Sequence, residues 1–146
     1  ALTHQHEMAI VEMGANHQGE IAMLCELSNP DFGIITNIGK AHLEGFGGEE
    51  GVIEGKSEMY NYLSQNDKLA FINLEDKIQV EKSKTLKSYS FGINKEVANV
   101  NISSIAANPF VQIQFSNLFI QTHLIGLYNA NNINAALTIG KYFGGP

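Results

Sequence analysis

Short apolar runs alternate with amphipathic stretches through the first half of the chain. The runs are Met8 to Met13, Ile34 to Ile38 and Leu69 to Ile72, and each is followed by a stretch able to form a helix. This order is typical of βαβ units, whose strands pair in parallel. We therefore predict the α/β class, with a mostly parallel sheet flanked by helices.

Two amphipathic helices are predicted between these strands, because apolar positions recur there at three- and four-residue spacing. The shared face of the first consists of Ile21, Leu24, Cys25 and Ser28, and that of the second of Val52, Ile53, Lys56, Met59, Tyr60 and Leu63. Lys56 is thus a charged residue on an apolar helical face.

From Val97 onward the apolar period changes to two, which predicts a small antiparallel β appendage. The alternating positions are Val111, Ile113, Phe115, Leu118, Ile120, Thr122 and Leu124. Ser116-Asn117 supplies the turn between them. A last helix is predicted from about Asn129 to Tyr142, ended by the Gly-Gly-Pro that follows.

Composition narrows the class of protein. The 146 residues, 44% hydrophobic, are enough for one domain with its own core. The net charge is −6 and all nine basic residues are lysines, so we expect no nucleic-acid or anionic-lipid partner. The single cysteine excludes an internal disulfide, and no apolar run approaches the roughly 20 residues that span a bilayer. With a polar start and no visible signal peptide, the expected location is the cytoplasm.

Glu12 and His42 are candidates for a cation site. Glu12 lies in the first apolar run, which predicts a buried parallel strand, and His42 follows the second run. The carboxyl ends of parallel strands share one edge of a sheet, where ligands bind. A carboxylate and an imidazole together suit a divalent cation. Magnesium ordinarily prefers oxygen ligands, and a lone His-Glu pair would otherwise suggest zinc. The alternatives are a structural acid bonded to loop amides and a histidine that only forms hydrogen bonds.

Lys56 is a candidate for a modified or nucleophilic amine. Burial on the apolar face would lower the pKa of its ammonium group and leave a neutral amine, able to attack carbon dioxide and form a carbamate. The alternative is a lysine whose stem packs while its head reaches water.

Phosphate-binding and base-binding patterns give weaker signals. Gly51 to Ser57 resembles a Walker A loop, but it has three residues instead of four between the glycines and follows a loop rather than a strand. We interpret it as a coincidence. The asparagines at the start of the last helix have two interpretations: Asn129 or a neighbour caps the helix, or the Asn129 amide pairs with the edge of an adenine.

Together these segments resemble the Mur ligases, and most closely the type that joins D-alanyl-D-alanine to a UDP-N-acetylmuramoyl tripeptide. The residues that carry the resemblance are Glu12 to Ile21, Pro30-Asp31, Thr36 to Gly39, Ala41 to Gly47, Lys56-Ser57-Glu58 and Gly126 to Ala136. It covers most of the chain and is weakest from Asp76 to Leu124.

The resemblance implies ATP and Mg²⁺ as cofactors and a role for each candidate residue. Glu12 and His42 would bind magnesium, and a carbamylated Lys56 would help to place a second ion. Asn129 and Asn132 would lie at the adenine. Two further expectations are weaker: Asn16 and His17 face the substrate, and Tyr128 lies at the nucleotide although the family usually has histidine there.

The resemblance also implies a reaction and a domain plan. The tripeptide carboxylate would attack the γ-phosphoryl group of ATP, and the dipeptide amine would then attack the acyl phosphate. The family's Walker A segment, UDP-substrate domain and carboxyl-terminal domain are absent from residues 1–146, so we expect a central-domain fragment that is inactive alone. The fragment is expected to self-associate through an exposed sheet edge, and the full-length enzyme to be a monomer. The alternatives are a non-enzymatic binding module on the same fold and a ligase of the folylpolyglutamate synthase type.

Overall fold

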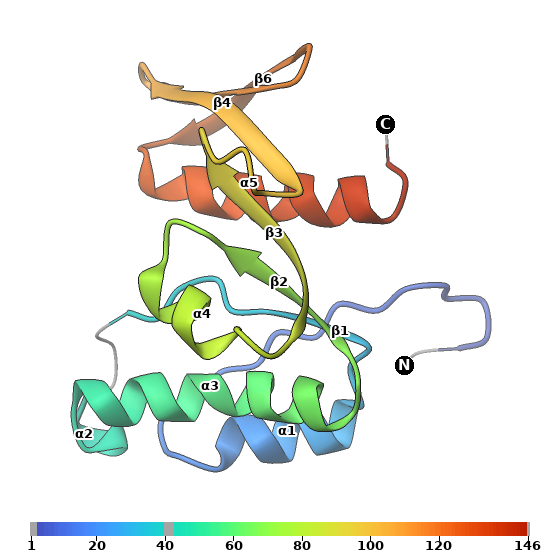
Figure 1. Cartoon of the computed structure of the whole chain (residues 1–146), viewed down its shortest axis with the longest axis vertical. Coiled ribbons are helices and arrows are strands. Elements are labelled where there is room, and N and C mark those ends of the chain that lie inside the picture. Colours follow the sequence, from blue (N-terminus) through green and yellow to red (C-terminus); the bar gives the residue numbers. More distant parts are fainter. Residues whose placement is uncertain (1–2, 40–42, 146) are drawn as a thin grey trace.

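The computed structural model describes residues 3–39 and 43–145 (Figure 1). Its elements, in chain order, are α1 (Glu20–Ser28), β1 (Phe32–Ile34), α2 (Leu43–Phe46), α3 (Glu49–Gln65), β2 (Leu69–Asn73), α4 (Lys77–Lys82), β3 (Lys87–Ile93), β4 (Val100–Ala107), β5 (Phe110–Phe115), β6 (Leu118–Ile125) and α5 (Tyr128–Tyr142). None of these helices is long and apolar enough to cross a membrane within the described part of the chain.

The six strands form one sheet in the order in which they follow one another along the chain. Strands β1 to β4 pair in parallel, and β4 to β6 pair antiparallel. The structure therefore confirms the α/β class, the parallel sheet and the antiparallel appendage. The predicted turn at Ser116 is also present, with φ of 52° at that residue.

Helices α3 and α5 cover opposite faces of the parallel strands, as the alternation of side chains along β1 demonstrates. Phe32 packs its ring against Tyr142 of α5, with the ring centroids 5.4 Å apart. The next residue, Gly33, faces α3 so closely that a Cβ atom would lie 2.8 Å from Leu63. The central strands consequently have apolar cover on both sides, which is typical of parallel sheets.

Two apolar clusters form the core. The first lies between α3 and the strands β1 and β2, and its buried members are Ile35, Tyr60, Leu63, Ala70 and Ile72. The second lies between α5 and strands β3 to β5, and its buried members are Phe91, Val100, Ile102, Val111, Ile113, Ala130 and Ala135.

The strand predicted from Met8 to Met13 is wrong. These residues form no helix or strand, and Ile10 is 91% exposed. No described strand pairs with them, and the side chains of Met8, Ile10 and Val11 are exposed, whereas Met13 is half-buried against Cys25. The apolar run alone cannot supply the hydrogen-bonded neighbours that a parallel strand needs.

The boundaries of the second strand and one further strand also differ from expectation. β1 ends at Ile34, where the predicted strand was to begin, because the polar Thr36 and Asn37 beyond it leave the sheet. Strand β3 was not predicted, and the helix expected after the run Leu69 to Ile72 is the short α4. Asp76 is the signal for α4, since its carboxylate accepts hydrogen bonds from the backbone N–H groups of Ile78 and Gln79.

Candidate functional site

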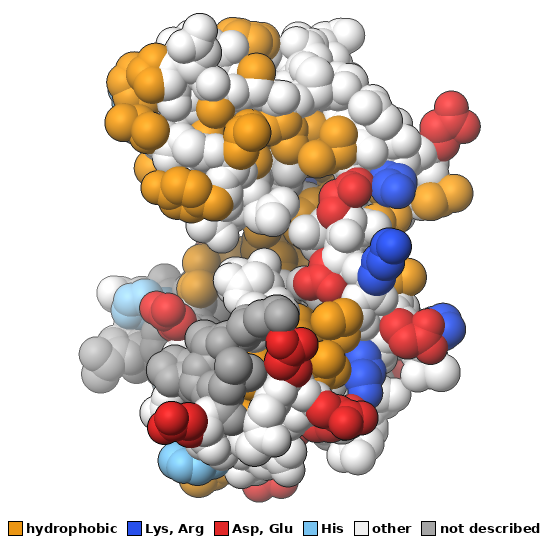
Figure 2. All heavy atoms as spheres, turned by 90° about the vertical axis from the view of Figure 1, so that its left-hand side faces the viewer, with side chains coloured by type: hydrophobic (Ala, Val, Ile, Leu, Met, Phe, Trp, Pro, Cys, Tyr) orange, Lys and Arg blue, Asp and Glu red, His pale blue; other side chains and the backbone are white. Residues whose placement is uncertain are grey.

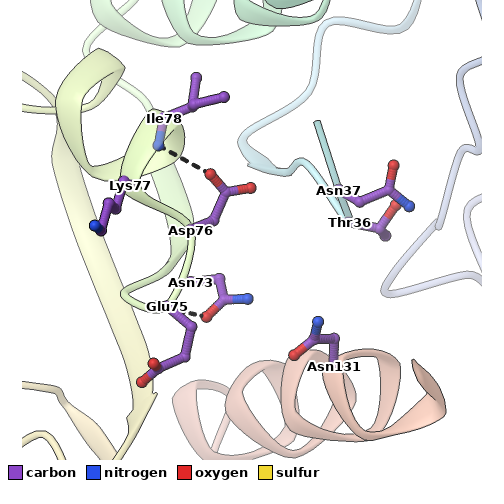
Figure 3. Close-up of a pocket in the computed structure, with 8 residues that line it drawn as sticks. All are labelled: Thr36, Asn37, Asn73, Glu75, Asp76, Lys77, Ile78 and Asn131. Carbon is purple, nitrogen blue, oxygen red and sulfur yellow. Dashed lines mark hydrogen bonds between the residues drawn. The ribbon is translucent and has the colours of Figure 1, made fainter. Parts of the chain in front are cut away.

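A cleft of about 410 Å³ opens where strands β1 and β2 end (Figure 3). Thr36 and Asn37 line it from the end of β1, Asn73 and Asp76 from the end of β2, and Asn131 from α5. Figure 3 shows Lys77 and Glu75 turned away from this space. The cleft thus occupies the carboxyl edge of the parallel strands, where α/β proteins bind their ligands.

The groups that face the cleft are mainly amides. Asn73 is 5% exposed, and its Oδ1 accepts the N–H of Glu75 at 3.0 Å, which turns its Nδ2 toward the open space (Figure 3). Asn131 presents its amide from the opposite wall. Each amide offers both donors and an acceptor, so these groups can bind the hydroxyls or ring nitrogens of a ligand.

Lys56 lies at the same edge and contacts a cleft residue. Its Nζ donates to the backbone carbonyl of Asn37 at 2.9 Å and to the Asn37 Oδ1 at 3.3 Å. Its side chain is half-buried, and desolvation by burial lowers the pKa of its amine. The predicted desolvation of this lysine is therefore confirmed, although its head bonds to a backbone carbonyl.

The predicted cation site is only partly within the described residues. Glu12 is exposed, so its expected burial in a strand is wrong. His42 lies outside the described residues. Among residues 3–39 and 43–145, no group of three or more His, Cys, Asp or Glu side chains is placed to hold a metal ion. The convergence of Glu12, His42 and Lys56 stays a prediction.

The loop that carries Asn16 and His17 is fixed by Glu20. The Glu20 Oε2 accepts the backbone N–H groups of Asn16 at 2.7 Å and His17 at 3.2 Å, and its Oε1 lies 3.2 Å from the His17 Nδ1. These hydrogen bonds, that from Asn16 first, lower the pKa of the Glu20 carboxyl group. The His17 ring remains accessible, with 66% of its side chain exposed.

Close packing brings this loop against α2. A Cβ atom at Gly45 would lie 2.3 Å from the carbonyl oxygen of Asn16, and one at Gly51 would lie 1.8 Å from that of Phe46. Only glycine permits backbones to approach this closely. The two stretches that carry the most specific part of the resemblance, 14–21 and 41–47, thus meet through their described residues.

Glu58 has a structural role that the sequence did not reveal. Helix α1 has no side-chain cap of its own, and the Glu58 carboxylate accepts the N–H groups of Gly19 at 2.5 Å and Ala22 at 3.0 Å. A carboxylate is stabilised at the positive end of a helix. Glu58 therefore joins α3, two residues beyond Lys56, to the start of α1.

The asparagines of α5 are placed differently from expectation. The helix is capped at Leu127, and Asn129 is its second residue, so the N-cap interpretation of Asn129 is wrong. Its Nδ2 instead donates to the Ile125 carbonyl at 2.9 Å. Tyr128 is 77% exposed and Asn132 is also exposed. Asn131, which the sequence did not single out, is the asparagine of this helix that lines the cleft.

Comparison with known proteins agrees with this geometry. The profile of the Mur ligase middle domain family matches residues 1–140. The chain is 34% identical over 145 residues to the UDP-N-acetylmuramoyl-tripeptide--D-alanyl-D-alanine ligase of Bacillus subtilis, covering 99% of this chain and 32% of that protein. It is also 34% identical to the ligase of the same name from Haemophilus influenzae, covering 98% of this chain and 32% of that protein.

Solved structures give the same result. The fold is similar to MurF from Acinetobacter baumannii, with a TM-score of 0.81 and 30% identity over 98% of this chain and 32% of that one. It is also similar to MurF ligase from Thermotoga maritima in complex with ADP, with a TM-score of 0.71 and 26% identity over 92% of this chain and 32% of that one. The chain spans about a third of the length of these relatives. It belongs to the Mur ligase middle domain family.

Proposed function

We propose that this chain is the central, ATP-handling domain of a cytoplasmic ligase that adds D-alanyl-D-alanine to UDP-N-acetylmuramoyl tripeptide, a step in the synthesis of peptidoglycan precursors. Relatives of that name match nearly the whole chain, although the chain spans only a third of their length. The observation that carries the proposal is the position of Lys56. It is a desolvated amine at the carboxyl edge of a parallel sheet, beside a cleft of amide groups.

The proposed reaction has two steps. The tripeptide carboxylate attacks the γ-phosphorus of ATP, which gives an acyl phosphate and ADP. The amine of the dipeptide then attacks the activated carbonyl, loses a proton, and expels inorganic phosphate to leave an amide. Because the substrates carry the reacting groups, the domain contributes mainly position and charge compensation. A domain that holds only part of the site would be inactive alone.

The described residues fit magnesium through their oxygen chemistry. Glu12 offers an exposed carboxylate, and a carbamate on Lys56 would add two further oxygens of the kind that magnesium prefers. A carbamate forms only on a neutral amine, and burial shifts Lys56 toward that form. When bound, the ion would neutralise charge on the phosphates. We include His42 as the third ligand of this proposal.

The nucleotide base is proposed to lie along the start of α5. Asn129 uses its amide N–H on the Ile125 carbonyl, which leaves an oxygen that can accept from the amino group of adenine. Asn132 and the exposed ring of Tyr128 lie on the same helix. Asn16 and His17 are proposed to face the substrate, since the Glu20 carboxylate fixes their loop while the imidazole stays accessible.

The decisive experiment measures phosphate release by the whole ligase supplied with ATP, Mg²⁺, UDP-N-acetylmuramoyl tripeptide and D-alanyl-D-alanine. We expect release that requires both peptide substrates. Lys56→Arg, which keeps the charge but cannot form the carbamate, should lower kcat on the order of 100-fold, as loss of one positioned charge-stabilising group commonly does. Lys68→Arg is the matched control, because Lys68 pairs with Asp31 and does not line the cleft.

Other outcomes identify the competing functions. Phosphate release with a folate and glutamate, and none with the peptides, would identify a ligase of the folylpolyglutamate type. Nucleotide binding with no turnover of either set would indicate a non-enzymatic module. If Lys56→Arg releases phosphate at the wild-type rate, Lys56 does not belong to the proposed site.

We further propose that the isolated chain self-associates at one sheet edge, whereas the whole ligase is monomeric. β1 is an outermost strand of the described sheet, and Met8, Ile10 and Val11 expose apolar side chains. An edge strand favours pairing with another chain, and exposed apolar residues favour association as well. Light scattering on the isolated chain should show a mass that rises with concentration, and a constant monomer mass would reject this proposal.

A further inference from the structure

Gln79 of α4 joins the segments that form the cleft. Its side chain is fully buried, at 0% exposure. The Nε2 donates to the carbonyl of Ile35 at 3.0 Å and to the Asp76 Oδ2 at 3.2 Å. The Oε1 accepts the backbone N–H of Asn73 at 3.2 Å and the hydroxyl of Tyr60 at 3.3 Å. One amide therefore contacts the ends of β1 and β2, the start of α4, and α3.

Only a primary amide satisfies all four of these partners. Two of them accept hydrogen bonds and two donate, which matches the two N–H groups and the two lone pairs of a glutamine amide. A buried group that loses such a partner bears the full cost of desolvation. Water cannot replace a lost partner of this amide directly, because Gln79 itself is 0% exposed.

Ile35, which Gln79 contacts, lies within two residues of the candidate site in the sequence. Ile35 precedes Thr36 and Asn37, which line the cleft, and Asn37 accepts both hydrogen bonds from Lys56. β1 itself ends at Ile34, so the Gln79 bond holds the chain just after the sheet ladder stops. On the second wall, the bonds to Asn73 and Asp76 hold the last residue of β2 and the N-cap residue of α4, both of which line the cleft.

We propose that Gln79 is a positioning residue for the ligase reaction, which sets the place of Asn37, and through it of Lys56, by its hydrogen bond to the Ile35 carbonyl. The inference rests on the proposed function for its effect on turnover. According to this proposal, the buried side chain of Gln79 holds the two walls of the cleft at a fixed separation.

The test exchanges the two groups that face each other in this network. Gln79→Glu keeps the acceptor for Asn73 and Tyr60, but it loses both donors and places a carboxylate against Asp76. The double variant Gln79→Glu, Asp76→Asn removes that repulsion and restores a donor between positions 76 and 79. The Ile35 carbonyl still lacks its partner. Stability and positioning are thereby separated.

In the whole ligase, Gln79→Glu should lower both Tm and kcat/KM, the latter by about 10- to 100-fold, since small misplacement of a reacting group has effects of that size. The double variant should recover only part of the Tm lost in Gln79→Glu, because the Ile35 carbonyl stays unpaired, while its kcat/KM stays about tenfold or more below that of Asp76→Asn. Tyr60→Phe is the matched control, because it removes one bond to the same amide from a residue that does not line the cleft. It should lower Tm and leave kcat/KM within about twofold of wild type.

Hydrogen exchange over residues 34–38 in the same proteins gives a second readout that needs no turnover. Exchange should rise in both Gln79 variants and stay at the wild-type rate in Tyr60→Phe. Activity that recovers together with Tm in the double variant, or exchange that does not change, would overturn the inference. Absence of turnover in the wild-type ligase would reject the proposed function instead, and the exchange data would still decide the role of Gln79.

Discussion

The parallel and antiparallel halves of the sheet differ in how far their apolar residues are buried. In the parallel half, Phe71 and Ile72 of β2 are each 2% exposed, because α3 and α5 cover the two faces. In the antiparallel half, Phe119 and Ile125 of β6 are 61% and 59% exposed. Figure 2 shows apolar side chains gathered over the upper part of the molecule, where β4 to β6 lie, and charged ones mainly over the lower part.

This difference explains why the candidate site lies in the parallel half. Cover on both faces leaves only the ends of the strands open to ligands, and the carboxyl ends of β1 and β2 lead directly into polar residues. The antiparallel half needs cover on one face only. It has its own core against α5 but no comparable convergence of strand ends.

The largest expected effect concerns the two cores. Leu63→Ala removes a side chain with no exposure from the α3 core, and Ile113→Ala does the same in the core beneath α5. Each should lower the free energy of unfolding by about 2–5 kcal/mol. Urea unfolding followed by circular dichroism should show one transition that either variant shifts. Two transitions, of which each variant moves only one, would show that the halves unfold separately. Leu27→Ala, at a 77% exposed site, is the control.

The next effect concerns a glycine contact near the candidate site. Gly51→Ala would place its Cβ against the carbonyl of Phe46, so α2 must shift, at a cost of roughly 1–3 kcal/mol in the free energy of unfolding. Gly140→Ala in α5 meets open space and should instead stabilise the protein by about 0.5–1 kcal/mol. Thermal unfolding of both variants checks the pair. Equal Tm values for the two variants would mean that α2 shifts without loss of stability.

Lys56 gives a prediction with a definite sign in pH. Its folded pKa is lowered by burial, so the unfolded chain binds more protons in the pH range between the lowered pKa and the ordinary one. Stability should therefore rise with pH through that range, and Lys56→Met should remove this rise. Carbamate formation should also increase with pH, because it requires the neutral amine. ¹³C NMR with labelled bicarbonate should show a carbamate signal that grows with pH, is lost in Lys56→Arg and persists in Lys84→Arg.

The smallest expected effect is at the open face of β6. Phe119→Ser should change the free energy of unfolding by no more than about 0.5 kcal/mol, because the exposed ring buries little apolar surface that the substitution could remove. Chemical unfolding of the monomer measures this. A loss above about 1 kcal/mol would contradict the comparison, since it would mean that this face is packed in solution.

The sequence predicted some features well because their signals are local. The spacing around Lys56 placed it on a half-buried helical face, and the turn at Ser116 follows from two alternating segments. It failed for Glu12, whose apolar run predicted a strand that lacks a partner in the described sheet. It also missed Gln79, because a glutamine in a six-residue helix has no periodic signal, and its four partners lie on different elements.

By itself, the sequence determined the α/β class, the change from parallel to antiparallel pairing and the desolvation of Lys56, since each depends on the order and period of nearby side chains. Only the tertiary structure decided that Asn73, Asp76 and Asn131 line one cleft, that Glu58 caps α1, and that Gln79 joins both walls. These contacts connect residues up to dozens of positions apart, and a hydrogen bond between distant groups is fixed by the packing of the elements that carry them.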